Sequence, residues 1–264
     1  MDLKLKDKTA LITGGSQGIG LAVAEALAAE GVHLLLTARH QDQLEKAKHQ
    51  VNAKYDVAVH TFVADLSKAD DVARLVNSAL ETYDRTDILI NNAGTGTDET
   101  IENSRDEDWY YYWDLHVMAA IRLSRAMLPH MRAHGGGVIL NNASICATQP
   151  LGHEPIYNTT KAALVMFGKC LAEEAIAYNI RVNTINPGLI RTEGWEKAAR
   201  EEEANGGVTA DTFLDGIAKK YAPIGRFASP EELAHFFVFL CSDQASYAVG
   251  SSFYVDGGWL RTVS

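Results

Sequence analysis

The chain has 264 residues, enough to bury a large core, and 47% of them are hydrophobic while 22% are charged. Its formal net charge of −10 argues against a groove for nucleic acid or another polyanion. No apolar run is long enough to span a bilayer, and residues 1–8 lack the apolar segment of a secretory signal, so we expect a cytoplasmic protein. Cys146, Cys170 and Cys241 are far apart, which predicts reduced thiols and no metal site.

The first predicted strand, 9–13, is short and apolar, and it runs into a glycine-rich turn followed by a helix-forming stretch, 21–29. Strand, glycine turn and helix in this order favour a dinucleotide site, because the backbone can come close to a phosphate and free amides face the anion. The spacing is Gly-x-x-x-Gly-x-Gly rather than Gly-x-Gly-x-x-Gly, and a plain β-α turn is the alternative. The expected cofactor contacts in this turn are Gly14, Ser16, Gln17, Gly18, Ile19 and Gly20.

Further along the chain, apolar strand-like runs alternate with amphipathic stretches. This alternation predicts an α/β fold, a doubly wound parallel sheet, in a single domain over residues 1–264. Cofactors bind such sheets at the carboxyl ends of the strands, and polar or glycine residues follow four of the predicted strands. The strands predicted after the first are 32–36, 58–63, 88–90, 138–140, 180–185 and 252–255.

The end of the second strand bears on the choice of nicotinamide nucleotide. Enzymes that prefer NAD usually have an acid there, whereas this chain has Ala38 followed by Arg39. A planar, permanently charged guanidinium suits a 2′-phosphate, and no acid stands beside it. The pair favours NADPH, with a surface arginine as the alternative.

A tyrosine and a lysine, Tyr157 and Lys161, lie four residues apart, which places both on one face of a helix. Near neutral pH a tyrosine is a poor proton donor or base unless its phenolate is stabilised, and a neighbouring positive charge lowers its pKa by Coulomb attraction. The pair predicts an acid/base device, although solvated surface helices carry the same spacing.

Together these features resemble the short-chain dehydrogenase/reductase family, and the resemblance runs essentially from end to end of the chain. Ser144 lies thirteen residues before Tyr157, which is the usual separation in that family. The matching segments are Thr13-Gly14-x-x-x-Gly18-x-Gly20, Asp65, Asn91-Asn92-Ala93-Gly94, Ser144, Tyr157-x-x-x-Lys161, Asn186-Pro187-Gly188 with Thr192, and Val255-Asp256-Gly257-Gly258.

The resemblance implies a Rossmann fold and an NADP(H)-dependent oxidoreductase that moves a hydride between the cofactor and a carbonyl or secondary alcohol. It implies that Tyr157 exchanges a proton with the substrate oxygen, that Ser144 holds this oxygen, and that Lys161 lowers the pKa of Tyr157 and binds the ribose. Gln17 stands where some NADPH-dependent relatives have a basic residue, so the preference for NADPH over NADH depends on Arg39. The alternative is a non-catalytic NADP(H)-binding redox sensor or regulator of the same fold, against which both Tyr157 and Lys161 argue.

The same resemblance implies further cofactor contacts at the strand ends. Asp65 and Leu66 would touch the adenine, while Asn91 is expected to tie central strands together. The other implied contacts are Asn92, Ala93 and Gly94 beside the nucleoside, and Pro187, Gly188, Ile190 and Thr192 near the nicotinamide.

One residue departs from the family pattern, because His116 stands where the family usually has an asparagine that helps to hold a water in a proton relay. A neutral imidazole can donate and accept, so His116 could hold a similar water as a fourth catalytic residue and add a titration near neutral pH. A histidine that only fills the space of a backbone kink is the alternative. The relay hypothesis predicts that His116→Asn retains activity and shifts the pH profile.

Substrate identity is expected to lie mainly in residues 193–222, a predicted substrate lid with a flexible joint at 205–207. Sugar, steroid, ketoester and tropinone-like substrates all remain open. A sugar epimerase or dehydratase would need an added substrate domain, and the family resemblance implies a homotetramer or homodimer. Residues expected near the pocket are Trp195, Phe213, Leu214, Tyr221, His153 and Glu154.

Overall fold

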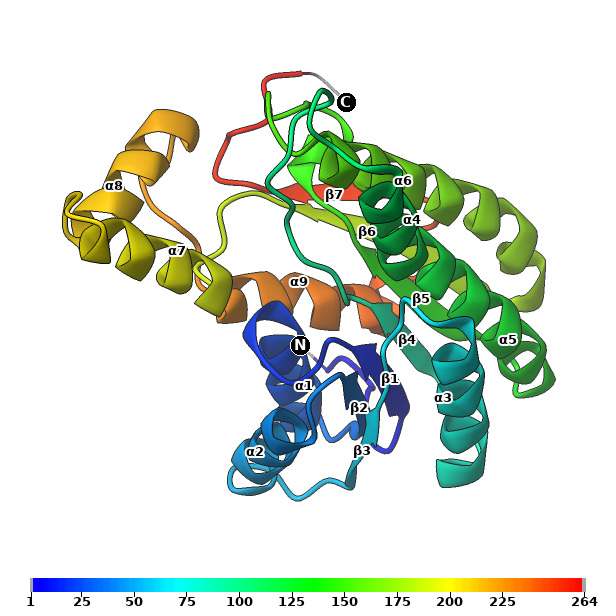
Figure 1. Cartoon of the computed structure of the whole chain (residues 1–264). Coiled ribbons are helices and arrows are strands. Elements are labelled where there is room, and N and C mark those ends of the chain that lie inside the picture. Colours follow the sequence, from blue (N-terminus) through cyan, green and yellow to red (C-terminus); the bar gives the residue numbers. More distant parts are fainter. Residues whose placement is uncertain (1, 263–264) are drawn as a thin grey trace.

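The sheet of this protein, seen in a computed structural model that describes residues 2–262, consists of seven parallel strands in the order β3-β2-β1-β4-β5-β6-β7 (Figure 1). Strand order reverses between β1 and β4, as in a doubly wound sheet with a nucleotide crevice at that point. The predicted α/β fold is therefore confirmed. The strands are β1 Thr9–Thr13, β2 His33–Ala38, β3 Val59–Val63, β4 Ile88–Asn91, β5 Gly137–Asn142, β6 Ile180–Pro187 and β7 Ser252–Val255.

Helices cover both faces of this sheet, and a π-helical stretch, Asp114–Met118, joins α4 to α5. Helices α1 and α9 pack together on one face, while α3, α5 and α6 lie on the other (Figure 1). The α-helices are α1 Gly18–Ala29, α2 Gln41–Asn52, α3 Ala69–Thr82, α4 Asp106–Trp113, α5 Ala119–Ala133, α6 Pro155–Ala175, α7 Glu193–Ala204, α8 Ala210–Tyr221 and α9 Pro230–Cys241.

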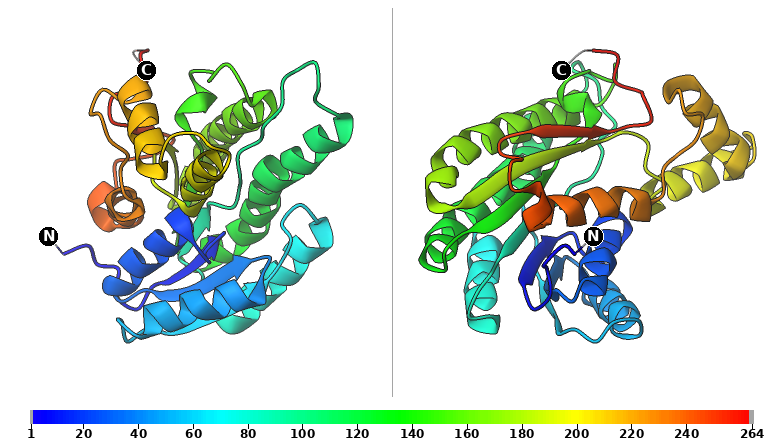
Figure 2. Two further views of the ribbon diagram at one scale, coloured as in Figure 1. Left: turned by 60° about the vertical axis from the view of Figure 1, so that its left-hand side comes forward. Right: turned by 180° about the vertical axis from the view of Figure 1, so that it is seen from behind.

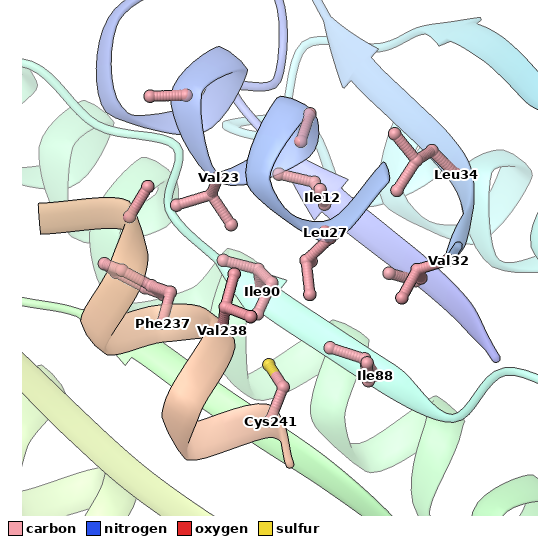
Figure 3. Close-up of a cluster of buried hydrophobic side chains, with 14 of the residues drawn as sticks. Ile12, Val23, Leu27, Val32, Leu34, Ile88, Ile90, Phe237, Val238 and Cys241 are labelled. Carbon is pink, nitrogen blue, oxygen red and sulfur yellow. The ribbon is translucent and has the colours of Figure 1, made fainter. Parts of the chain in front are cut away.

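The two faces of the sheet form two separate apolar cores, and β1 shows how one strand serves both. Ala10 and Ile12 belong to the core under α1 and α9, whereas Leu11 belongs to the core on the opposite face. This alternation follows from the two-residue period of a strand. Figure 3 shows Ile12 in the first core beside Val23 of α1 and Phe237 of α9.

Several strands extend further than their apolar runs predicted. β5 continues to Asn142 and β6 to Pro187, because Asn142 pairs with Ile185 and Pro187 pairs with Val255 of β7. Polar residues expected after these strands therefore lie inside their last turns of pleat. A rigid ladder, rather than a loop, positions them at the carboxyl edge of the sheet.

Helices α7 and α8 project from the body of the molecule and pack mainly against each other (Figures 1 and 2). They lie within the predicted lid, and residues 205–209 join them, including the expected joint. A parallel bridge between Ile190 and Ala228 closes the base of this projection. Among residues 2–262, no helix combines the length and apolar character needed to cross a bilayer.

Candidate active site

The glycine turn after β1 is shaped by close approach of the backbone. A Cβ added at Gly20 would lie 2.1 Å from the carbonyl oxygen of Gly14, so only glycine fits there. Gly14 and Gly18 have left-handed φ angles of 64° and 55°. A Cβ at Gly18 would meet only Thr192, at 3.6 Å. Thr192 therefore faces the turn, as its predicted place near the nicotinamide requires.

The start of α1 fits an anion. Its N-cap, Gln17, makes no side-chain capping bond, and its first turn holds no acidic residue, so the first amides of the helix have no anionic partner within the protein. A groove of about 480 Å³ runs along this turn, and Ser16, Gln17, Gly18 and Thr192 line part of it. These residues fit the pyrophosphate of a dinucleotide.

An asparagine network ties the turn to the strands beside it. The Asn92 amide nitrogen Nδ2 donates to the Thr13 carbonyl at 2.8 Å, and Asn92 Oδ1 accepts from Asn142 Nδ2 at 2.8 Å. Asn91 Nδ2 donates to Asn141 Oδ1 at 2.9 Å, which links β4 to β5 and confirms the strand-tying role expected of Asn91. The backbone beside the predicted nucleoside site is therefore held at both ends.

Three residues of the predicted acid/base device lie together at this edge of the sheet. Tyr157 and Lys161 both come from the first turns of α6, and the ammonium lies 5.4 Å from the centroid of the phenol ring. Lys161 is buried, and its Nζ donates to the carbonyl oxygen of Asn142 at 2.8 Å. Ser144 follows β5, and its hydroxyl hydrogen-bonds to Tyr157. Sequence reasoning brought these three residues together correctly but missed Asn142, whose place two residues before Ser144 was the available signal.

Burial governs the titration of this pair. It raises the pKa of the Tyr157 phenol above its ordinary value, Cys146 and Glu154 raise it further, and only the Ser144 hydroxyl opposes them. The expectation that Lys161 lowers this pKa is therefore wrong for this arrangement. Burial also lowers the pKa of Lys161 to about 8. At neutral pH the phenol carries its proton and the lysine is mostly charged.

His116 lies in the π-helical stretch between α4 and α5, buried against Tyr157, with the two ring centroids 5.6 Å apart. The Thr95 amide donates to His116 Nε2 at 3.3 Å, so the ring proton is on Nδ1, which donates to Thr160 Oγ1 at 2.9 Å. Thr160 Oγ1 in turn donates to the carbonyl oxygen of Tyr157 at 3.0 Å. The imidazole thus joins the loop after β4 to the helix that carries the catalytic pair.

This geometry corrects two expectations for His116. Both ring nitrogens already have protein partners, so neither is free to hold a relay water. Burial first, and then the charge of Lys161, lowers the pKa of His116 to about 3, so the expected titration near neutral pH is wrong. The π-helical stretch supports the alternative in which the histidine fills a backbone kink. Thr95 and Thr160, its two partners, had no signal in the sequence.

The predicted adenosine contacts lie around the ends of β2 and β3. Leu66 is buried, while Asp65 Oδ1 already accepts from the Ser67 hydroxyl at 2.7 Å. Burial raises the pKa of Asp65, but the hydrogen bonds from Ser67 outweigh it and hold the pKa below its ordinary value. Arg39 is exposed, and its Nη1 donates to the Tyr111 hydroxyl at 3.3 Å. No ion pair involves Arg39 within the described part of the chain.

On the nicotinamide side, Ile190 is buried, and a Cβ added at Gly188 would lie 2.7 Å from the Cα of Asp256. Pro187 ends β6, and a Cβ at Gly94 would lie 3.1 Å from His116 Cδ2. The two glycines therefore let neighbouring segments approach the same crevice. Ala93 and Ile19 both pack at the edges of the apolar cores, and Ala93 donates its amide to Thr13 Oγ1 at 3.0 Å.

A carboxylate also points toward this site. Glu154, the N-cap of α6, has a left-handed φ of 57°, which is uncommon for a residue other than glycine. A Cβ at Gly96 would lie 2.9 Å from Glu154 Oε1, and the charge of Glu154 raises the pKa of Tyr157. Burial raises the pKa of Glu154 itself. The site thus offers a hydrogen-bond acceptor near the phenol.

The cysteines and possible metal ligands take no part in this arrangement. Cys146 is buried next to Ser144, and burial raises the pKa of its thiol to about 11, so it stays protonated at neutral pH. Cys170 and Cys241 are also free thiols. Within residues 2–262, no three His, Cys, Asp or Glu side chains are grouped to hold a metal ion.

Comparison with known proteins identifies relatives over the whole length of the chain. A family model described as enoyl-(acyl carrier protein) reductase matches residues 14–260. An uncharacterized oxidoreductase, YvrD, from Bacillus subtilis is 37% identical over 100% of both chains. Dehydrogenase/reductase SDR family member 4 from Oryctolagus cuniculus is 36% identical and covers 96% of this chain and 94% of its own.

A solved structure resembles this one still more strongly. L-sorbose reductase from Gluconobacter frateurii, in complex with NADPH and L-sorbose, is 53% identical, covers 100% of both chains and superposes with a TM-score of 0.98. Levodione reductase is 30% identical, with a TM-score of 0.90 over 98% of this chain and 99% of its own. The fold and the arrangement of strand ends are therefore shared with enzymes that reduce carbonyl compounds.

Proposed function

Because the chain belongs to the short-chain dehydrogenase/reductase family, and is an oxidoreductase of it, we propose that it reduces ketones with NADPH and that its substrates are polyhydroxylated ketoses. The observation that carries the proposal is the buried group of Ser144, Tyr157 and Lys161 beside an anion-binding turn. Keeping both Tyr157 and Lys161 argues against a non-catalytic sensor. We further propose a single domain with residues 193–222 as its substrate lid, a cytoplasmic location and a homotetramer.

NADPH, when bound, supplies the hydride, and the residues of the chain supply orientation and a proton. The backbone of residues 14–20 binds the pyrophosphate, and Arg39 binds the 2′-phosphate in a bidentate way that a ribose hydroxyl does not allow. Lys161 binds the nicotinamide ribose through the ammonium protons that Asn142 leaves free. Complexes of the similar L-sorbose reductase with NADPH support this choice of nucleotide.

Tyr157 is the general acid of the proposed reduction. Its raised pKa keeps the phenol protonated at neutral pH, which is the form that gives a proton to a carbonyl oxygen becoming an alkoxide. Ser144 donates a hydrogen bond to the same oxygen and so stabilises the developing charge. The charged ammonium of Lys161, on the same helix face, favours the phenolate that remains.

The substrate class follows from the acceptor near the phenol. A carboxylate such as Glu154 accepts hydrogen bonds from hydroxyl groups, whereas a plain steroid or cyclic ketone offers no hydroxyl at that place and would leave the carboxylate desolvated and unpaired. The similar reductase whose structure was solved with L-sorbose acts on a ketose, which supports the same class here.

The test combines nucleotide binding with turnover. Calorimetry would compare NADPH and NADH on the wild type, Arg39→Ala and a control, Arg105→Ala, whose guanidinium pairs with Asp108 on the surface. We expect Arg39→Ala to weaken NADPH binding about 10- to 100-fold, because it removes charge-assisted hydrogen bonds, and to leave NADH binding unchanged. Equal binding of NADPH and NADH by the wild type would contradict the choice of nucleotide.

Turnover is followed by loss of NADPH absorbance with ketoses such as L-sorbose, cyclic ketones and ketoesters. We expect the ketoses to be reduced with the highest kcat/KM. Preference for an apolar cyclic ketone would overturn the substrate class, and tight NADPH binding without turnover of any ketone would favour the sensor.

A further inference from the structure

The closing motif of the chain, Val255-Asp256-Gly257-Gly258, has no part in the chemistry described above, yet it lies where three parts of the site meet. The segment 254–261 runs from the end of β7 past the loop after β6 and on toward the loop after Ser144 (Figure 2). Asp256 holds its turn, because Oδ2 accepts from the Leu260 amide at 2.6 Å and Oδ1 from the Gly258 amide at 3.0 Å.

One side of this segment contacts the nicotinamide loop and the end of the lid. The Gly188 amide donates to the Val255 carbonyl at 3.0 Å, and the Ile224 amide donates to the Gly257 carbonyl at 3.1 Å. A Cβ added at Gly257 would lie 2.6 Å from Ile224 Cγ2. The residues that follow α8 are thus fastened directly to the segment.

The other side of the segment contacts the catalytic loop between Ser144 and Tyr157. Gln149 Oε1 accepts from the Arg261 amide at 3.1 Å, and the hydroxyls of Thr148 and Tyr254 lie 2.8 Å apart in a hydrogen bond. The loop that leads into the catalytic helix therefore depends on the end of the chain for two of its hydrogen bonds.

Between these two sides, Trp259 packs against Tyr221, the last residue of α8, with ring centroids 5.0 Å apart and planes inclined by 35°. Both rings join a small apolar cluster around Leu189, Ala218 and Ala222, apart from the two main cores. Helices α7 and α8 have few other contacts with the body. This cluster is accordingly their main apolar attachment.

We propose that segment 254–261 is a connector that sets the position of the lid relative to the catalytic loop, and that Trp259 is the positioning residue through which it holds α8. This inference rests on the proposed function only for the substrate it would affect. Removing the indole frees the end of α8 without touching the acid/base group or the phosphate turn. The expected consequence is weaker ketose binding with unchanged nucleotide binding.

Limited proteolysis of the whole protein tests the attachment without any substrate. The lid carries exposed trypsin sites at Lys197, Arg200, Lys219 and Lys220. For Trp259→Ala we expect cleavage there about three- to tenfold faster than in the wild type, since an aromatic pair contributes on that scale beyond its buried area. Trp259→Phe should restore slow cleavage, and Tyr247→Ala, which removes a fully exposed aromatic ring, should not change it. Equal rates for Trp259→Ala and the wild type would overturn the proposal.

Kinetics on the best ketone substrate of the wild type then test positioning. Trp259→Ala should raise the KM for the ketone about three- to tenfold with kcat and NADPH affinity nearly unchanged, and Trp259→Phe should recover most of the loss. Gln149→Ala cuts the other side of the connector, so the double variant should raise KM by less than the product of the two single effects. Independent multiplication, or a parallel fall in NADPH affinity and melting temperature, would overturn the connector in favour of a general stabilising role. Failure of the wild type to reduce any ketone would count against the proposed function and leave the proteolysis result to decide the connector.

Discussion

The nucleotide end and the substrate end of this crevice are built in different ways. At the nucleotide end, backbone and amide groups are joined across β1, β4 and β5, with Asn92 bonded to both Thr13 and Asn142 at 2.8 Å. At the substrate end, α7 and α8 stand out from the body and are held by exposed ion pairs such as Arg200 with Glu193, and by one small aromatic cluster. Exposed ion pairs contribute little to stability.

The difference separates what must be invariant from what can adapt. Hydride transfer requires the nucleotide and the acid/base group to be held within a fraction of an ångström, and a ladder of buried hydrogen bonds does this. Substrate choice requires only that the walls around the reacting carbon be adjustable. Changes at the nucleotide end should therefore have large, general effects, and changes at the substrate end small, local ones.

The largest effect is expected where chemistry meets the fixed end, in Tyr157→Phe. Loss of the phenol proton should lower kcat about 100- to 10,000-fold, because a positioned general acid contributes on that scale, while the affinity for NADPH stays within a fewfold of the wild type. Single-turnover NADPH oxidation and calorimetry measure the two effects separately. Tyr110→Phe, which removes an exposed hydroxyl from α4, is the matched control. Turnover of Tyr157→Phe at wild-type rates would mean that another group supplies the proton.

A second large effect is expected in Gly20→Ala, which places a methyl group 2.1 Å from the Gly14 carbonyl oxygen and 2.6 Å from Asn92 Nδ2. Because both neighbours belong to the bonded turn, the turn must move, and overpacking of this kind costs about 1–3 kcal/mol. NADPH affinity should fall by roughly 5- to 150-fold, as measured by calorimetry. Wild-type affinity in this variant would show that the phosphates do not lie on this turn.

A moderate effect is expected for pH. Lys161 loses its charge as the pH rises through its pKa of about 8, so kcat/KM for ketone reduction should decline above that value. His116, whose pKa is lowered to about 3, is neutral at all working pH values and should add no step. His116→Asn, which can still accept from Thr95 and donate to Thr160, should lose activity only a fewfold and keep the same pH profile between pH 5 and 9. A displaced profile in that variant would restore the relay hypothesis.

The same contrast marks the limit of sequence reasoning. Residues of the nucleotide end are bound by sterics and backbone chemistry, so Gly14, Gly18 and Gly20 announce their turn from spacing alone. The pKa values could not be foreseen, because a charge four residues away predicts a lowered pKa for Tyr157, whereas burial by tertiary packing dominates it. The partners of His116 come from segments remote in sequence, Thr95 and Thr160, and no local pattern marks either one.

The smallest effect is expected at the substrate end, where Gly216→Ala gives a direct counterpart to the change at Gly20. Gly216 is exposed in the middle of α8, and an added Cβ meets no atom within 4 Å. Alanine should therefore stabilise this helix by about 0.5–1 kcal/mol through lower backbone entropy of the unfolded segment. Hydrogen exchange of the α8 amides should slow about two- to fivefold while NADPH affinity stays unchanged. Because the same glycine-to-alanine change weakens the nucleotide end and strengthens the substrate end, a shared loss of nucleotide binding in both variants would refute the separation of the two regions.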